Sequence, residues 1–212
     1  MKVYVDSDVA VKLAQWGLLQ RFTQHLTKQG KADLYTVSTL RYRFKLADKT
    51  KAVALVGSMP AVDQLTAFVA ACKPPLGHDA AVAAALTDVP SVDAGEAALF
   101  AAAANYDAAL VDTGDKNALR ALGGLGPGHV ATKALAGKLA CLEQTLHYLV
   151  SRWTFVVVSG AIAAYPKADA TATKCFSSAD ESKALAALEA KVSQLRPHCA
   201  TLLGDKPFNW IA

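Results

Sequence analysis

The stretch SVDAGEAALFAAAANYDAALVDTGDKNALRAL, residues 91–122, decides the fold of this chain. Its alanine-rich first half predicts a helix, the apolar run that ends at Asp112 predicts a buried strand, and KNALRAL predicts a second helix. Three carboxylates, Glu96, Asp112 and Asp115, therefore fall at the ends of these elements. Because ligands of a strand-and-helix sheet collect beyond the carboxyl ends of the strands, these acids are candidates for a metal site.

Two of these acids also have an explanation that involves no ligand. Asp93 and Glu96 have the spacing of a capping box, in which each side chain accepts a hydrogen bond from the backbone N–H of the other residue. Asp115 precedes the predicted helix KNALRAL and suits an N-cap. The helix macrodipole favours carboxylates at such positions whether or not they take part in chemistry. Taken singly, each is better explained as a cap than as a ligand.

A fourth acid, at the start of the chain, changes that balance. MKVYV predicts a strand that ends at Asp6, and an amphipathic helix is expected over residues 8–22. A strand that ends in an aspartate and enters a helix repeats the arrangement of AALVD at residues 108–112. If the two strands are neighbours in a parallel sheet, Asp6 and Asp112 meet at one edge. Asp6 and Asp8 could also be caps, and Asp8 is the more expendable because it lies within the first helical turn.

The segments VYVDSDVAVKLAQWGLL and DAGEAALFAAAANYDAALVDTGDKNALRAL together resemble the PIN-domain family, a group of metal-dependent ribonucleases that includes the toxins of many toxin–antitoxin pairs. The resemblance covers about residues 1–125 and rests on the order, spacing and strand–helix context of the acids. It implies an α/β fold in which a parallel sheet is flanked by helices. A mostly helical C-terminal extension is expected to follow this PIN-like part.

The same resemblance implies a site and its chemistry. Catalytic and metal-binding roles would fall to Asp6, Glu96, Asp112 and Asp115, which would hold Mg²⁺ or Mn²⁺ and so activate water for attack on an RNA phosphodiester. Thr113 would hydrogen-bond a carboxylate or the water. The expected partners are RNA and an antitoxin protein.

One departure from the family pattern leaves a second function open. PIN domains usually carry a glutamate on the second helix, but LYTVSTLRYRFKLADK at residues 34–49 has no glutamate, and Arg41 or Arg43 stands where that acid is expected. An arginine inside a carboxylate cluster weakens cation binding, because hard cations need several oxygen ligands and are repelled by positive charge. The alternative is therefore a PIN-derived module that binds RNA or protein without catalysis.

The charge is distributed unevenly along the chain. Residues 1–60 carry ten Lys and Arg against four Asp and Glu, whereas residues 61–125 carry three against eight. A basic segment beside an acidic one suits a nuclease, because cations hold phosphates and carboxylates hold the metal. The densest basic patch interleaves cations with aromatic residues and could track a single strand of RNA: Arg41, Tyr42, Arg43, Phe44, Lys45, Lys49 and Lys51. An ordinary solvated helix face would explain the patch equally well.

Between the two acid-bearing parts, the sequence predicts alternating short elements. Residues 27–33 form a polar connection, and residues 34–40 a short strand that passes into a helix. A turn at residues 57–60 separates an apolar segment from a helix at residues 61–72. Residues 80–86 predict a short alanine-rich helix or loop.

The glycine-rich segment at residues 123–128 predicts a division of the chain into a PIN-like domain, residues 1–128, and a C-terminal extension, residues 129–212. Leucines three and four residues apart then predict one helix over residues 130–152. Such a leucine stripe suits a core or a partner helix, so an assembly protein and a homodimer also remain open.

Two further elements are expected in this extension. WTFVVVSGAIAAY, residues 153–165, predicts a buried strand followed by a turn or short helix. Residues 178–196 predict a helix with Ser178 and Glu181 as its capping box. The aromatic tail, residues 206–211, could dock on the body of the protein or on a second subunit.

Other classes of chemistry find no support in the sequence. The four cysteines are scattered without a CxxC pair or histidines at zinc-ligand spacing, and no GxSxG elbow is present. The N-terminal residues lack the apolar core of a secretory signal, and the longest apolar run is too short to span a bilayer. We therefore expect a cytoplasmic protein without a membrane partner.

Overall fold

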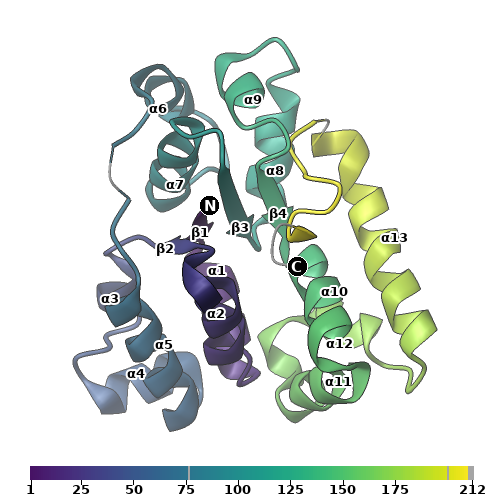
Figure 1. The fold of residues 1–212 in the computed structure, drawn as a ribbon. Helices are drawn as coiled ribbons and strands as arrows, with labels where there is room; N and C mark the ends of the chain where they lie inside the picture. The colour runs from purple at the N-terminus through teal and green to yellow at the C-terminus, as the bar shows by residue number, and fades with distance from the viewer. Residues whose placement is uncertain (76, 200, 210–212) are drawn as a thin grey trace.

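A computed structural model describes residues 1–75, 77–199 and 201–209 of the chain. Within these residues, four strands form one sheet in the order β2-β1-β3-β4, with every neighbouring pair parallel: β1 (Lys2–Val5), β2 (Asp33–Tyr35), β3 (Ala109–Thr113) and β4 (Leu139–Cys141). Helices surround the sheet, and helices make up most of the chain beyond residue 141 (Figure 1). The predicted α/β fold, with a parallel sheet flanked by helices and a helical C-terminal part, is confirmed.

The sheet is buried on both faces, which explains its near-continuous apolar strands. All five residues of β3 are buried, as are Val3, Tyr4 and Val5 of β1. Val5 pairs with Asp112, so β1 and β3 end at the same edge of the sheet and Asp6 and Asp112 come together there. Single bridges extend the sheet outward, from Tyr35 to Lys73 on one side and from Leu139 to Leu203 on the other.

Helices pack on the sheet and on one another in layers. The helices that contact strands directly are α1 (Ser7–Gln15), α2 (Leu19–Thr27), α7 (Ala94–Ala104) and α10 (Leu142–Trp153). Outside them, α5 (Met59–Ala71) packs on α1 and α2, and α13 (Glu181–Cys199) packs on α8 (Lys116–Gly124) and α10 (Figure 1). The shorter elements are η1 (Lys28–Gly30), α3 (Leu40–Arg43), α4 (Lys49–Val56), α6 (Ala80–Leu86), α9 (Val130–Ala134), α11 (Phe155–Ala164), η2 (Pro166–Ala168) and α12 (Ala170–Cys175).

The helix predicted at residues 8–22 is two helices. Gly17 has a φ of +71°, and the backbone N–H of Leu18 reaches back to the carbonyl of Leu13 at 2.8 Å. These are features of a Schellman ending, in which a residue in the left-handed conformation terminates the helix. The chain therefore turns between α1 and α2, and the prediction of one continuous helix is wrong.

The single helix predicted at residues 130–152 is also wrong. The structure divides this range into α9, a turn at Gly137 with a φ of +70°, the strand β4, and α10. The five leucines of the predicted stripe are all buried in the core: Leu135, Leu139, Leu142, Leu146 and Leu149. They are therefore not an exposed stripe that could bind a partner helix, and a homodimer, if one forms, must use another surface.

The buried strand predicted at the start of residues 153–165 is wrong: Trp153 ends α10, and α11 covers Phe155–Ala164. Its buried residues Phe155, Val158 and Ile162 recur at helical spacing, while Val156 is 76% exposed. A short apolar run has no clear period, so its β-branched residues favoured a strand although tertiary packing selects a helix.

The last helix, α13, begins and ends three residues later than predicted. The side chain of Asp180, and not Ser178, accepts a hydrogen bond from the backbone N–H of Lys183, so the predicted Ser178–Glu181 capping box is wrong. The tail docks on the body as far as Phe208, which is buried and stacks on Tyr148. Trp210 and Ile211 of the tail lie outside the described residues.

The predicted order of the middle elements is confirmed. β2 passes into α3 through a short connection. Gly57 and Ser58 separate α4 from α5, which begins at Met59, two residues earlier than predicted, so Met59 and Pro60 belong to the helix and not to the turn. Helix α6 covers residues 80–86. In the part of the chain that the structure describes, no single helix is long and apolar enough to cross a membrane; α4 and α5 reach the required length only as a pair that is bent by 105°.

The glycine-rich segment does not separate the sheet from the C-terminal part of the chain. Gly123 and Gly124 belong to α8, and β4, beyond residue 128, is a strand of the same sheet as β1 and β3. Residues on both sides of the predicted division therefore build the edge of the sheet at which the acids lie.

Candidate active site

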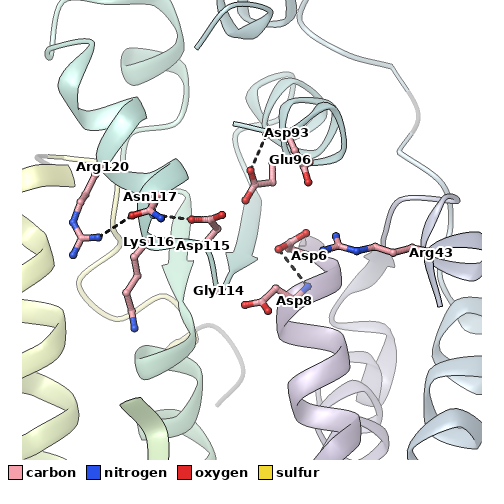
Figure 2. Close-up of a pocket in the computed structure, with 10 residues that line it drawn as sticks. All are labelled: Asp6, Asp8, Arg43, Asp93, Glu96, Gly114, Asp115, Lys116, Asn117 and Arg120. Carbon is pink, nitrogen blue, oxygen red and sulfur yellow. Dashed lines mark hydrogen bonds between the residues drawn. The ribbon is translucent and has the colours of Figure 1, made fainter. Parts of the chain in front are cut away.

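A cavity of about 420 Å³ lies beyond the carboxyl ends of β1 and β3 (Figure 2). One set of lining side chains is acidic and consists of Asp6, Asp8, Asp93, Glu96 and Asp115. The other set is Arg43, Lys116, Asn117 and Arg120, and Gly114 completes the lining. Three of the four acids predicted as site residues thus line one cavity, although they come from parts of the chain that are far apart in sequence.

Asp6 is held at the point where β1 becomes α1. It is the N-cap of α1, and its carboxylate accepts from the backbone N–H groups of Ser7 at 2.6 Å and Asp8 at 3.4 Å. The carboxylate is buried, in spite of its charge. The cap therefore fixes the side chain in the cavity wall.

Asp93 and Glu96 form the predicted capping box at the start of α7. The Asp93 carboxylate accepts from the backbone N–H of Glu96 at 2.8 Å, and the Glu96 carboxylate accepts from that of Asp93 at 3.0 Å. Each of these bonds occupies one oxygen of its carboxylate. A cap and a ligand are consequently not exclusive roles for these residues, because the second oxygen can face a cation.

Asp115 is the N-cap of α8, as predicted, and one of its oxygens accepts from the backbone N–H groups of Asn117 and Ala118. Thr113, at the end of β3, is fully buried, and its hydroxyl oxygen accepts from the backbone N–H of Asp115 at 3.2 Å. Thr113 thus shapes the turn that presents Asp115 to the cavity.

Asp112 lies beneath the cavity and does not line it. Its side chain is fully buried, and the hydroxyl of Thr145, in the first turns of α10, donates to its two oxygens at 2.8 Å each. Burial raises the pKa of Asp112 to about 8. Sequence reasoning missed Thr145, because nothing in the local pattern of α10 shows that its first turn meets β3.

Two carboxyl groups in the cavity, those of Asp6 and Glu96, are costly to ionise. Burial, with the negative charges of Asp8 and Asp93, raises the pKa of Asp6 to about 6. Burial also raises the pKa of Glu96 to about 8, and Asp6 and Asp115 add to the effect by repulsion. Among the ion pairs of the described residues, none involves Asp6, Glu96 or Asp115. These three carboxyl groups are therefore open to a cation that enters the cavity.

The basic patch is only partly at the cavity. Arg43, from the end of α3, lines it, whereas Arg41, Tyr42 and Lys45 lie outside it on the exposed surface of α3 and the turn after it. Tyr42 is 72% exposed, and the Arg41 guanidinium lies over its ring at 5.6 Å from the centroid. Of the two arginines that could replace the missing acid, Arg43 is the one beside the carboxylates.

The rim acid Asp8 is tied to the C-terminal part of the chain. Lys12 bonds Asp8 at 2.7 Å and Asp169, the N-cap of α12, at 2.8 Å. Gly114 leaves room for the Asp8 carboxylate, because a Cβ at Gly114 would overlap the Asp8 side chain. Asp8 therefore already shares a cation, Lys12, with Asp169, whereas Asp6 is in no ion pair with a described residue.

The carboxylates of the cavity are the type of ligand that a hard divalent cation prefers. Oxygen ligands and an excess of negative charge are what Mg²⁺ and Mn²⁺ require. Burial, and then the neighbouring carboxylates, raise the pKa values of Asp6 and Glu96, and a bound cation would favour the ionised forms of both groups. As the described side chains stand, no three His, Cys, Asp or Glu residues lie close enough together to hold a metal ion, so binding would require the acids to draw together.

Comparison of the chain with protein-family models, with curated proteins and with solved structures yields no match.

Proposed function

We propose that this chain is a metal-dependent endoribonuclease of PIN type. The observation that carries the proposal is the cavity at the carboxyl edge of the sheet. Asp6, Glu96 and Asp115 line it and form no ion pair with any described residue, and Arg43, Lys116 and Arg120 also belong to its lining. Carboxylates beside cations suit a phosphodiester, because the acids hold the metal and the cations hold the phosphates.

In this proposal, Asp6, Glu96 and Asp115 hold Mg²⁺ or Mn²⁺. When bound, the metal would act as a Lewis acid: it would lower the pKa of a water that it binds and stabilise negative charge on the phosphate. The reaction consumes one water: its oxygen bonds to phosphorus, one bridging P–O bond breaks, and the ribose oxygen that leaves takes up a proton. Asp112 lies below the cavity and supports the edge of β3, and Thr113 holds the Asp115 turn.

The exposed residues of α3 extend the site along the RNA. Arg43 at the cavity and Arg41 and Lys45 beyond it would contact phosphates of a single strand, while Tyr42 offers a ring for a base to stack on. We further infer a cytoplasmic location and an antitoxin as a protein partner, since the resemblance to toxin-type PIN domains carries both. A homodimer is compatible with the proposal but is not required by it.

The test is a calorimetric titration of Mn²⁺ into the wild type and into Asp6→Asn, followed by an RNA cleavage assay. Asparagine caps a helix about as well as aspartate, so this variant keeps the cap and removes the charge. We expect the Mn²⁺ affinity to fall by at least about 10-fold, the loss seen even for residues that only support a metal ligand. Asp79→Asn is the matched control, because Asp79 caps α6 in the same way but does not line the cavity. Equal Mn²⁺ binding by wild type and Asp6→Asn contradicts the proposal.

One observation favours a second function. Arg43 lines the cavity beside the carboxylates, where it can neutralise part of their charge without a metal. The chain would then be a PIN-like module that binds RNA or protein without catalysis. Salt-sensitive RNA binding together with no Mn²⁺ uptake supports this alternative, and Mn²⁺-dependent cleavage rejects it.

A further inference from the structure

An ion pair that the functions above leave unused joins the cavity to the interior of the protein. Lys116, the first residue of α8, directly follows Asp115 and lines the cavity. Its ammonium lies 2.5 Å from a carboxylate oxygen of Glu143, the second residue of α10. The Glu143 side chain is 3% exposed, whereas that of Lys116 is 26% exposed. The pair therefore has its acid in the core and its cation on a residue of the cavity wall, with the ammonium directed away from the cavity acids (Figure 2).

Burial of the Glu143 carboxylate carries a desolvation cost. Its second carboxylate oxygen, Oε2, is buried and has no hydrogen-bond partner among the described residues. A buried ion pair adds little to stability once the cost of removing both charges from water is counted, and an unbonded oxygen makes that cost larger. Glu143 lies in the first turn of α10, where the macrodipole favours a carboxylate, but an exposed residue of that turn would gain the same benefit without the desolvation cost.

The cavity explains what this carboxylate can do. Five acids line the cavity, so an RNA phosphate meets repulsion unless cations are held in fixed places among them. Arg43 and Arg120 are exposed residues on the surface of their helices. Lys116 is anchored from below by a buried carboxylate, which restricts where its ammonium can lie.

We propose that Lys116 contacts the scissile phosphate of bound RNA and that Glu143 is the positioning residue that holds its ammonium at the cavity wall. The inference rests on the proposed ribonuclease function and deepens it. Fixed positive charge aimed at an oxygen that gains negative charge during reaction stabilises the transition state more than the ground state. Lys116 then acts on the phosphate directly, and Glu143 acts only through Lys116.

The test compares Lys116→Met, Lys116→Arg and Glu143→Gln with the control Lys73→Met. Lys73 also pairs with an acid, Asp33, but this pair lies at the start of β2, at the opposite edge of the sheet from the cavity. The first measurement is the salt dependence of binding of a fluorescein-labelled single-stranded oligouridylate, followed by anisotropy in Ca²⁺. The second is kcat and KM for cleavage of the same RNA in Mn²⁺, with the melting temperature of every variant recorded.

For Lys116→Met we expect the slope of log K against log salt to lose about 0.7, the contribution of one phosphate contact on a single strand. Its kcat should fall about 100-fold, the loss expected when one group that stabilises the transition state is removed. Lys116→Arg should restore the slope. Glu143→Gln should keep the slope and KM, because Lys116 stays charged, but lower kcat about 10-fold because the ammonium is no longer fixed.

The outcomes separate this inference from the proposed function. If the wild type binds and cleaves RNA but Lys116→Met has the slope and kcat of Lys73→Met, only the Lys116 inference is overturned. If Glu143→Gln lowers the melting temperature but leaves kcat unchanged, Glu143 is a purely structural partner and its positioning role is rejected. A wild type that neither binds nor cleaves RNA rejects both.

Discussion

At the scale of single residues, the acids that cap three helices of this protein are also the acids of its candidate site. The backbone N–H groups at the starts of α1, α7 and α8 hold Asp6, Glu96 and Asp115 by hydrogen bonds of 2.6 to 3.4 Å. A carboxylate that is fixed by such bonds loses little conformational freedom when it binds a cation. Capping is therefore how the fold keeps three carboxyl groups, none of them in an ion pair with a described residue, at one edge of the sheet.

The two buried aspartates at this edge should respond differently to neutralisation. Asp112→Asn should lower Mn²⁺-dependent cleavage by less than about 10-fold, because Asp112 supports the site from below, whereas Asp6→Asn should lower it by more than about 100-fold. Cleavage rates at saturating RNA measure the difference. Equal and complete loss in both variants would show that Asp112 acts in the cavity itself.

Thr145 should matter for stability through its bond to Asp112. Thr145→Val keeps the shape of the side chain but removes the hydroxyl that donates to both oxygens of a fully buried carboxyl group, so we expect the free energy of unfolding to fall by about 1–3 kcal/mol. Urea denaturation of the two proteins measures the loss. The control is Thr23→Val, since the Thr23 hydroxyl donates to an exposed carbonyl on α2 and its removal should cost little.

The raised pKa values predict how stability depends on pH. Between their ordinary pKa values and the raised values of about 6 for Asp6 and about 8 for Glu96, the folded protein binds protons that the unfolded chain has released. The free energy of unfolding contributed by these groups therefore falls as pH rises, and the melting temperature should decline between about pH 5 and about pH 8. Because Mn²⁺ favours the ionised carboxylates, its stabilising effect should grow over the same range. A Mn²⁺ effect on the melting temperature that is constant with pH would count against ligation by Asp6 and Glu96.

The sequence predicted the acids of the site but not Thr145 and Glu143, because these two residues contact the site from a part of the chain that is distant in sequence. The capping box of Asp93 and Glu96 spans three residues, so the spacing alone reveals it. The bond from Thr145 to Asp112 joins residues 33 apart, and the Lys116–Glu143 pair likewise joins two elements. Such contacts depend on which strands become neighbours, and no local pattern encodes that.

At the scale of elements, the prediction is correct where the hydrophobic periodicity and the helix-capping residues point to the same boundaries. The helix–strand–helix series of residues 91–122 carries caps at both helix starts, and it folds as α7, β3 and α8. The prediction failed over residues 130–165 for two reasons. The leucines have the spacing of one helix but fall in a turn, a strand and a helix. The valine run favours a strand, but α11 packs as a helix. Gly137 and Thr154, both with positive φ, mark the real breaks in this range.

The contact between α8 and α13 gives a test at this scale. A Cβ at Gly123 would overlap the backbone carbonyl of His198, so Gly123→Ala should force the two helices apart and cost about 1–3 kcal/mol of stability. Gly124→Ala is a matched control on the next residue, where no atom of the described residues lies within 4 Å of the added methyl group. That variant should be more stable by about 0.4–1 kcal/mol, because alanine has less freedom than glycine in the unfolded chain. Thermal denaturation of the pair decides the point, and equal effects would mean that this helix contact is loose.

At the scale of the whole molecule, the segment beyond residue 128 is part of the structure that holds the site. β4 hydrogen-bonds to β3, Thr145 bonds Asp112, Glu143 pairs with Lys116, and Asp169 shares Lys12 with Asp8. Four separate interactions thus join this segment to residues at or directly beneath the cavity. The cavity and its supports should therefore form and melt together.

This coupling predicts that residues 1–128 do not fold alone. Without β4, the buried strand β3 becomes an exposed edge of five residues, and without α10 the Asp112 carboxyl group loses its hydroxyl donor in a site that excludes water. Loss of α13 also uncovers the face of α8 that packs on it, on which Gly123 meets the backbone of His198. A fragment of residues 1–128 should accordingly give no cooperative melting transition by circular dichroism and should bind no Mn²⁺, while the full chain melts in one step. If the fragment melts cooperatively and binds Mn²⁺ as tightly as the full chain, the C-terminal segment is an appendage, and the support that we assign to Thr145 and Glu143 is not needed.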